Sequence, residues 1–317
     1  MRHLFNYCPI DWYEDEMARR GCTLDGYLNE LGLDGIEQFV YGTEQLQRPY
    51  KRQSVGVHLN YWPYWMDFWL QKRERLQRLV SVDDEKERFF LEAGGVEVWL
   101  ERIRRNIRVS LDAEPEYFVW HVGQADDEEI FTYKFNYTDR QVLGEMAKVF
   151  NAVADEIPEH ITVLFENLWW PGLRLVSAED TAWFFSLLRR DNCGIMLDTG
   201  HLLNTNPGLR TEEEAAAYIC SIAANLGEQA KLIRGVHLSC SLSGEYQSSF
   251  ERRVPDKLDR VTIWKHIVSL DRHQPFATKA AARILERLQP EYVVHELSYD
   301  SMADMAAKVA EQLENCR

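Results

Sequence analysis

The chain has 317 residues, of which 45% are hydrophobic, and this composition indicates a folded globular protein with a large core. Its formal net charge of −15 argues against nonspecific binding to nucleic acid, because that binding depends on Lys and Arg. The sequence lacks the run of about 18 apolar residues that spans a membrane, and its N-terminal segment becomes acidic too early for a signal peptide. We therefore expect a soluble, cytoplasmic protein.

Short β-rich apolar runs alternate with longer segments of helical periodicity, a pattern typical of β-α units around a parallel sheet. The predicted strands are Arg2–Tyr7, Gly35–Val40, Ser54–Leu59, Tyr117–Val122, Ile161–Glu166, Cys193–Asp198, Ile233–Leu238 and Tyr292–Leu297. Eight such units predict a (β/α)8 TIM barrel, with an open doubly wound sheet as the structural alternative.

Predicted helices follow most of these runs. Ser177 and Thr211 each begin a segment with capping-box spacing, whereas the amphipathic segments Asp139–Ala154 and Ala277–Leu288 lack that signature. Ser301–Leu313 is the last predicted helix and would close the ring.

Two predicted connections are longer than a β-α unit needs. Residues 60–116, after the third strand, look like a charged helical insertion, and residues 239–276, after the seventh strand, form a more irregular loop. Long connections of this kind lie at the C-terminal mouth of a barrel and usually shape its active site. No linker or composition break marks a second domain, so we expect one TIM-barrel domain over residues 1–317.

Six consecutive predicted strands end in an imidazole or a carboxylate. These residues are His58, His121, Glu166, Asp198, His237 and Glu296. In a barrel they would converge at one rim, where they would repel one another or need desolvation unless a cation compensates them. A mixed nitrogen and oxygen set suits zinc, manganese or iron, so we predict a divalent metal site, with zinc as the first expectation.

Three further residues could reach the same mouth. His201 follows Asp198 by three residues, and Asp271 and His273 lie in the long loop after the seventh strand. His295 is excluded, because alternation along the strand turns it toward the helical layer when Glu296 points inward.

Aromatic residues flank the predicted rim. Trp62 follows His58, and Trp169 and Trp170 follow Glu166. Such side chains can stack on a sugar ring of a substrate, but they can equally stack on a base or pack the insertion against the barrel.

The segments VLFEN, IMLDTGH, VHLS, LDRHQP and VHEL, in this order, resemble the xylose-isomerase-like TIM barrel superfamily (AP endonuclease family 2 type), which includes endonuclease IV and sugar isomerases and epimerases. The resemblance to endonuclease IV implies three ions held by nine side chains. The nine matching side chains group as His58, His121 and Glu166 around one ion; Glu166, Asp198, His237 and Glu296 around a second; and His201, Asp271 and His273 around a third. In the isomerase and epimerase branch the second group suffices, and the resemblance assigns Glu166 and Glu296 as catalytic residues that move protons on opposite faces of a substrate carbon.

The chain departs from the family pattern at two places. Gln274-Pro275 leads directly into Phe276 where a Gly-rich turn usually follows, and Cys240–Ser243 stands where epimerases have an arginine. Both departures identify a divergent member of the superfamily.

Two chemistries remain open on these grounds. A trinuclear site favours phosphoester hydrolysis, whereas one or two ions flanked by glutamates favour proton or hydride movement on a polyol. The acidic composition and aromatic rim favour a divalent-metal-dependent isomerase or epimerase that acts on a small sugar-like or sugar-phosphate substrate. The alternatives are an endonuclease IV-like hydrolase with a trinuclear zinc site and a non-catalytic metal- or ligand-binding barrel. We expect a small-molecule partner rather than nucleic acid, and homo-oligomerisation stays open.

Overall fold

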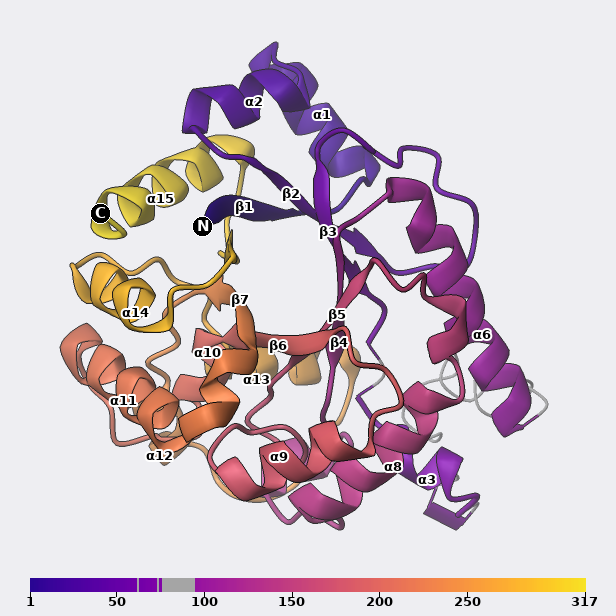
Figure 1. Ribbon diagram of the computed structural model, residues 1–317. Coiled ribbons are helices and arrows are strands. Elements are labelled where there is room, and N and C mark those ends of the chain that lie inside the picture. Colours follow the sequence, from indigo (N-terminus) through magenta and orange to yellow (C-terminus); the bar gives the residue numbers. More distant parts are fainter. Residues whose placement is uncertain (62, 73, 76–94) are drawn as a thin grey trace.

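Eight parallel strands close into a barrel in sequence order, with β1 paired to both β2 and β8. The computed structural model describes residues 1–61, 63–72, 74–75 and 95–317. The strands are β1 Arg2–Tyr7, β2 Gly35–Val40, β3 Ser54–Leu59, β4 Tyr117–His121, β5 Thr162–Glu166, β6 Cys193–Asp198, β7 Ile233–Leu238 and β8 Tyr292–His295. Helices surround the closed ring of strands (Figure 1), so the fold is the predicted (β/α)8 TIM barrel.

The helices of the described residues cover the outside of the barrel and fill its longer connections. They are α1 Asp11–Arg20, α2 Leu24–Leu31, α3 Met66–Trp69, α6 Val96–Ser110, α7 Glu129–Thr132, α8 Asp139–Asn151, α9 Ala178–Leu187, α10 Thr199–Leu203, α11 Glu212–Asn225, α12 Gly244–Ser249, α13 Arg260–Leu270, α14 Ala280–Leu288, α15 Met302–Asn315 and the 3-10 turns η1 Leu111–Ala113, η2 Ala154–Glu156 and η3 Gly227–Leu232. The two long connections predicted after β3 and β7 therefore carry helices of their own. Within the described ranges, no helix has both the length and the apolar character needed to cross a membrane.

Alternation along each strand separates the core into two layers. On β5, Val163 and Phe165 pack outward against the helices, whereas Leu164 lies in a cluster inside the barrel. Because successive side chains of a strand point to opposite faces, Glu166 continues the inward series. The interior is therefore apolar along the strands and turns polar where the strands end.

Five strands, β1, β2, β3, β6 and β7, have the predicted bounds, whereas β4 ends before Val122, β5 begins after Ile161, and β8 is shorter than predicted. The prediction extended β8 to Leu297, but the strand ends at His295. The backbone N–H of Ser298 donates to the carbonyl of His273 at 2.9 Å, so the chain turns from the sheet toward the long β7 loop. Glu296 therefore lies just beyond the strand rather than within it.

Two helix starts differ from the prediction. Segment Asp139–Ala154 was expected to lack a capping box, but Thr138 and Gln141 form one at the start of α8. The predicted segment Ala277–Leu288 begins its helix only at Ala280, and the backbone N–H groups of Ala277 and Thr278 before it donate to the Glu212 carboxylate.

Candidate metal centre

Strand register brings the strand-end residues into one cluster. His121 of β4 is the register partner of Glu166 of β5, and Asp198 of β6 is the partner of His237 of β7. Their sequence neighbours Phe165, Leu197 and Val236 belong to the outer core, so the polar side chains point into the barrel. The register therefore assembles the predicted ligands at one rim.

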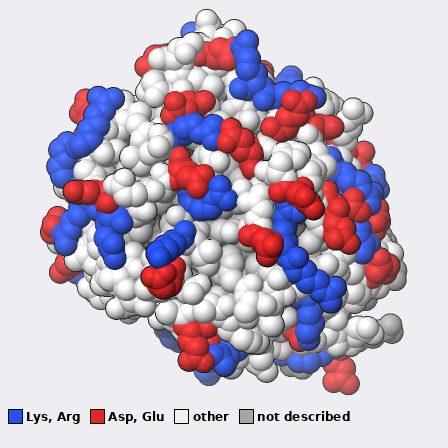
Figure 2. Space-filling view, viewed as in Figure 1, with Lys and Arg blue, Asp and Glu red and all other residues white. Residues whose placement is uncertain are grey.

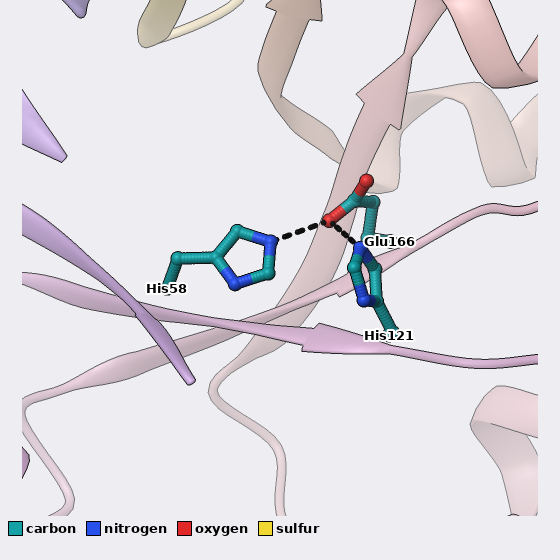
Figure 3. Close-up of side chains that lie close together, drawn as sticks. All are labelled: His58, His121 and Glu166. Carbon is teal, nitrogen blue, oxygen red and sulfur yellow. Dashed lines mark hydrogen bonds and ion pairs between the residues drawn. The ribbon is translucent and has the colours of Figure 1, made fainter. Parts of the chain in front are cut away.

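The first group consists of His58, His121 and Glu166, which each offer one ligand atom within 4.8 Å of the others. Figure 3 shows both imidazoles directed at the Glu166 carboxylate, with Nε2 of His58 at 3.2 Å and Nε2 of His121 at 2.7 Å from Oε2. Nδ1 of His58 lies 3.0 Å from the Leu59 carbonyl. If Nδ1–H donates to that carbonyl, the lone pair of Nε2 faces the group, as a metal ligand requires.

The second group shares Glu166 with the first and adds three residues, Asp198, His237 and Glu296. Nδ1 of His237 lies 2.9 Å from Oε2 of Glu296 and 3.5 Å from Oε1 of Glu166. Among the described residues, Nδ1 of His237, Oδ2 of Asp198 and Oε2 of Glu296 are buried without a hydrogen-bond partner. Three such atoms turned toward one another form a donor set that fits a divalent cation.

The third predicted group, His201, Asp271 and His273, also comes together, but less compactly. Both imidazoles pair with the same oxygen of Asp271, Oδ2, at 3.2 Å from Nε2 of His201 and 2.5 Å from Nε2 of His273. Within the described part of the chain, only the first two groups bring one ligand atom of every member within 4.8 Å.

The two carboxylate oxygens of Asp198 have different roles. Oδ1 accepts a hydrogen bond from the backbone N–H of His201 at 2.5 Å and caps α10, while Oδ2 faces the second group. The same turn places the His201 side chain next to Asp271. Asp198 and His201 thus lie at the start of α10 and also belong to the cluster.

Burial and the pairing of carboxylates with histidines act in opposite directions in this cluster. Burial, reinforced by Glu296 and Asp271, raises the pKa of Asp198 to about 7. Burial also opposes ionisation of Glu296, but His237 outweighs it and lowers the pKa of Glu296 to about 2. Every ion pair that the described residues make with Glu166, Asp198, Asp271 and Glu296 is to a histidine, so no Lys or Arg in these ranges neutralises them. Such a set, with three buried carboxylates and the partly exposed Glu296, suits a bound cation.

Ser241, in the segment where epimerases have an arginine, contacts the third group. Ser241 Oγ donates to Oδ1 of Asp271 at 3.0 Å and accepts a hydrogen bond from the backbone N–H of Arg272 at 2.9 Å. It thereby holds Asp271 with Oδ2 turned toward the two histidines.

One buried carboxylate of the interior was missed in the sequence. Glu37 of β2 is fully buried, and its Oε1 lies 3.0 Å from Nε2 of His237. It lies inside a strand rather than at its end, so a prediction from strand ends does not include it. An acid within the apolar run Gly35–Val40 was the available signal.

The tryptophans predicted at the rim that the structure describes, Trp169 and Trp170, are buried among other apolar side chains. Trp169 and Trp170 are 5% and 4% exposed and form a cluster with Phe131 of α7 and Leu270 of α13. The Trp169 ring nevertheless lies 5.0 Å from the ring of His201. Trp62 falls outside the described residues.

His266 packs α13 against this aromatic cluster, and its burial predicts that the stability of the contact depends on pH. Its ring stacks on Phe131 at 4.2 Å, Nδ1 lies 2.8 Å from the Tyr246 hydroxyl, and Nε2 lies 2.9 Å from the Ile130 carbonyl. Burial, with Arg252 nearby, lowers the pKa of His266. A histidine whose pKa is lowered by folding stabilises its contact fully above the unfolded value, and this contribution is lost as the pH falls below it.

We therefore expect amide hydrogen exchange in residues 260–270, corrected for its intrinsic rate, to become several-fold faster between pH 7.5 and pH 5.5. The variant His266→Gln can still donate to Ile130 and accept from Tyr246, so it serves as the control that lacks the titration. Equal pH dependence in both proteins would contradict the expectation.

The comparisons with known proteins concern both sequence and fold. The family described as "Xylose isomerase-like TIM barrel" matches residues 92–316. A search of curated protein sequences gave no significant match.

Several solved structures have a similar fold at low identity. A D-tagatose 3-epimerase-like protein has a TM-score of 0.52 at 14% identity, with 100% of this chain and 98% of that chain covered. Endonuclease IV from Thermus thermophilus has a TM-score of 0.51 at 14% identity, with coverage of 99% and 98%. Mannonate dehydratase from Streptococcus suis has a TM-score of 0.54 at 10% identity, with coverage of 100% and 92%. At these identities the likeness concerns the fold alone.

Proposed function

Because the chain belongs to the xylose isomerase-like TIM barrel family, we propose that it is a divalent-metal-dependent enzyme that isomerises or epimerises a small sugar-like or sugar-phosphate substrate. The observation that carries the proposal is the second group, in which Glu166, Asp198, His237 and Glu296 turn ligand atoms toward one another in the barrel mouth. Because one fold can support several chemistries, the reaction is inferred from the side chains of the site.

The two glutamates of this group differ in their access to solvent. The side chain of Glu296 is 16% exposed, whereas that of Glu166 is 1% exposed. In the proposed reaction one glutamate takes a proton from the carbon next to the substrate carbonyl, and the other returns a proton to the same or the adjacent carbon. When bound, a divalent ion would hold two neighbouring substrate oxygens and neutralise the negative charge that develops on them.

The distribution of charge supports a small substrate rather than DNA. The net charge is −15, and Figure 2 shows Lys and Arg side chains interspersed with Asp and Glu side chains on the face in view. Proteins that bind duplex DNA usually gather basic side chains into a continuous field, because phosphate contacts supply much of their affinity.

Phosphoester hydrolysis is the second candidate function. It is favoured by the convergence of His201 and His273 on Asp271, which adds a third set of potential ligands beside the first two. Several ions in one site would suit hydrolysis of a charged phosphoester. A barrel that binds metal or ligand without catalysis is the third alternative.

A two-arm assay separates these functions. Protein loaded with zinc or manganese is incubated in D₂O with a panel of ketoses and ketose phosphates, and proton NMR records deuterium uptake next to the carbonyl and formation of the epimer. In parallel, the same preparation is incubated with duplex DNA that contains an abasic site. Deuterium uptake with product formation supports the proposal, and efficient incision of the DNA without it overturns the proposal in favour of the hydrolase. Activity in neither arm, with the metal bound, favours the non-catalytic barrel.

A further inference from the structure

Glu37 is a fully buried carboxylate that no step of the proposed reaction uses. It projects from β2 into the barrel and accepts hydrogen bonds from three other strands. Asn6 of β1 donates from Nδ2 to Oε1 at 2.9 Å, and Tyr117 of β4 donates from its hydroxyl to Oε2 at 2.8 Å. His237 of β7 completes the set, with Nε2 at 3.0 Å from Oε1 and 3.2 Å from Oε2. Among the described residues, His237 is the ionic partner of this carboxylate.

The barrel is shaped to let Tyr117 reach Glu37. A Cβ at Gly56 of β3 would lie 2.1 Å from Cζ of Tyr117 and 2.5 Å from its hydroxyl oxygen. Glycine at this position therefore leaves the space in which the phenol ring crosses the interior. The Tyr117 ring also packs at 4.5 Å from the ring of Tyr292, which fixes it from the β8 side. The position of Glu37 is thus held by packing as well as by hydrogen bonds.

The contact with Glu37 determines which nitrogen of His237 faces the other members of the second group. Nε2 is turned to Glu37, so Nδ1 is turned to Glu296, Glu166 and Asp198. A neutral imidazole that donates Nε2–H to Glu37 presents the lone pair of Nδ1 to the second group. Carboxylates that hold the distal N–H of a ligating histidine fix its tautomer and ring orientation and increase its basicity.

We propose that Glu37 is a positioning residue, which holds His237 as the Nε2–H tautomer so that Nδ1 can bind the ion of the second group. Tyr117 and Asn6 support it by holding the carboxylate in place. The inference rests on the proposed function in that it requires an ion at the second group. It does not depend on which reaction that ion serves.

The test uses Co²⁺ alone as the probe of the full-length protein. Co²⁺ affinity is measured by calorimetry and the ligand field by visible absorption, in the wild type, Glu37→Gln and Tyr117→Phe. Glu37→Gln keeps the shape of the side chain but removes the charge, and we expect about a 10- to 100-fold loss of affinity, the usual range for such partners, with shifted absorption bands. Tyr117→Phe keeps Glu37 itself, and we expect a smaller loss in the same direction.

The matched control is Glu129→Gln. Glu129 is another buried carboxylate, 2% exposed, that accepts hydrogen bonds from the backbone N–H groups of Asp126 and Asn136 rather than from a member of either ligand group. Its loss should lower the unfolding temperature without changing Co²⁺ affinity or the absorption bands. A Glu37→Gln protein with wild-type affinity and spectrum would overturn the positioning role, whatever its stability. A wild-type protein that binds no Co²⁺ would overturn the proposed function as well.

Discussion

Glu166→Gln is expected to lower turnover by about 10²- to 10⁴-fold, the range for loss of a positioned acid or base, and to reduce the metal content as well. Glu166 is the residue that both groups share. Its Oε2 lies 2.7 Å from Nε2 of His121, and its Oε1 lies 3.2 Å from Nδ1 of His201 and 3.5 Å from Nδ1 of His237. An amide of the same shape replaces one of these oxygens with an NH₂ group, which cannot bind a cation or take a proton.

The measurement is kcat/KM on the substrate found in the two-arm assay, together with metal equivalents per chain. Glu179→Gln is the control, because Glu179 has an 82% exposed side chain and pairs with Arg140 on the outside of the barrel. Unchanged turnover in Glu166→Gln would contradict its role. Unchanged turnover with reduced metal content would instead show that the ion takes no part in the reaction.

Removal of the metal is expected to destabilise the protein by about 3–4 kcal/mol relative to protein in a 100- to 1,000-fold excess of zinc over its dissociation constant. Three buried carboxylates, Glu166, Asp198 and Asp271, converge with the partly exposed Glu296, and their ionic partners among the described residues are all histidines. A bound cation relieves their repulsion and satisfies the buried ligand atoms that have no hydrogen-bond partner.

Urea unfolding of chelator-treated and zinc-loaded protein measures this difference, and metal analysis gives the number of ions per chain. Asp198→Asn provides the matched comparison, because asparagine can still cap α10 but is a poorer ligand, so the gain from zinc should shrink. Close to three ions per chain would favour the hydrolase, and one or two would favour the isomerase. Equal stability with and without zinc, and no retained metal, would contradict the metal centre.

The fold was predictable because the strands of a closed parallel barrel are short, apolar and separated by helical segments. The bounds of β3 and β7 were predicted to the residue, since each run ends at a change from apolar to polar side chains. The start of α14 was not predictable in the same way. The residues before it are held by Glu212 of α11, which reaches the N–H groups of Ala277 and Thr278 only in the folded chain.

The same distinction applies to the cluster. Residues at strand ends, such as Asp198 and His237, could be identified because the end of a strand is visible in the sequence and its direction in a barrel is fixed. Glu37 could not be assigned a partner, because its contact with His237 depends on the lateral positions of β2 and β7 across the barrel. The packing of Trp169 and Trp170 likewise depends on α7 and α13, which come from distant connections.

Closure of the barrel has a consequence for the order of folding. The ring closes only when Arg2 of β1 pairs with Tyr292 of β8, a contact of very long sequence separation. The second group spans Glu166 to Glu296, so it also requires strands from distant parts of the chain. Contacts of this kind form late, because the entropy of closing a long loop is lost before the contact stabilises the chain. An ion held by the second group should therefore prolong the lifetime of the native state while leaving the rate of folding nearly unchanged.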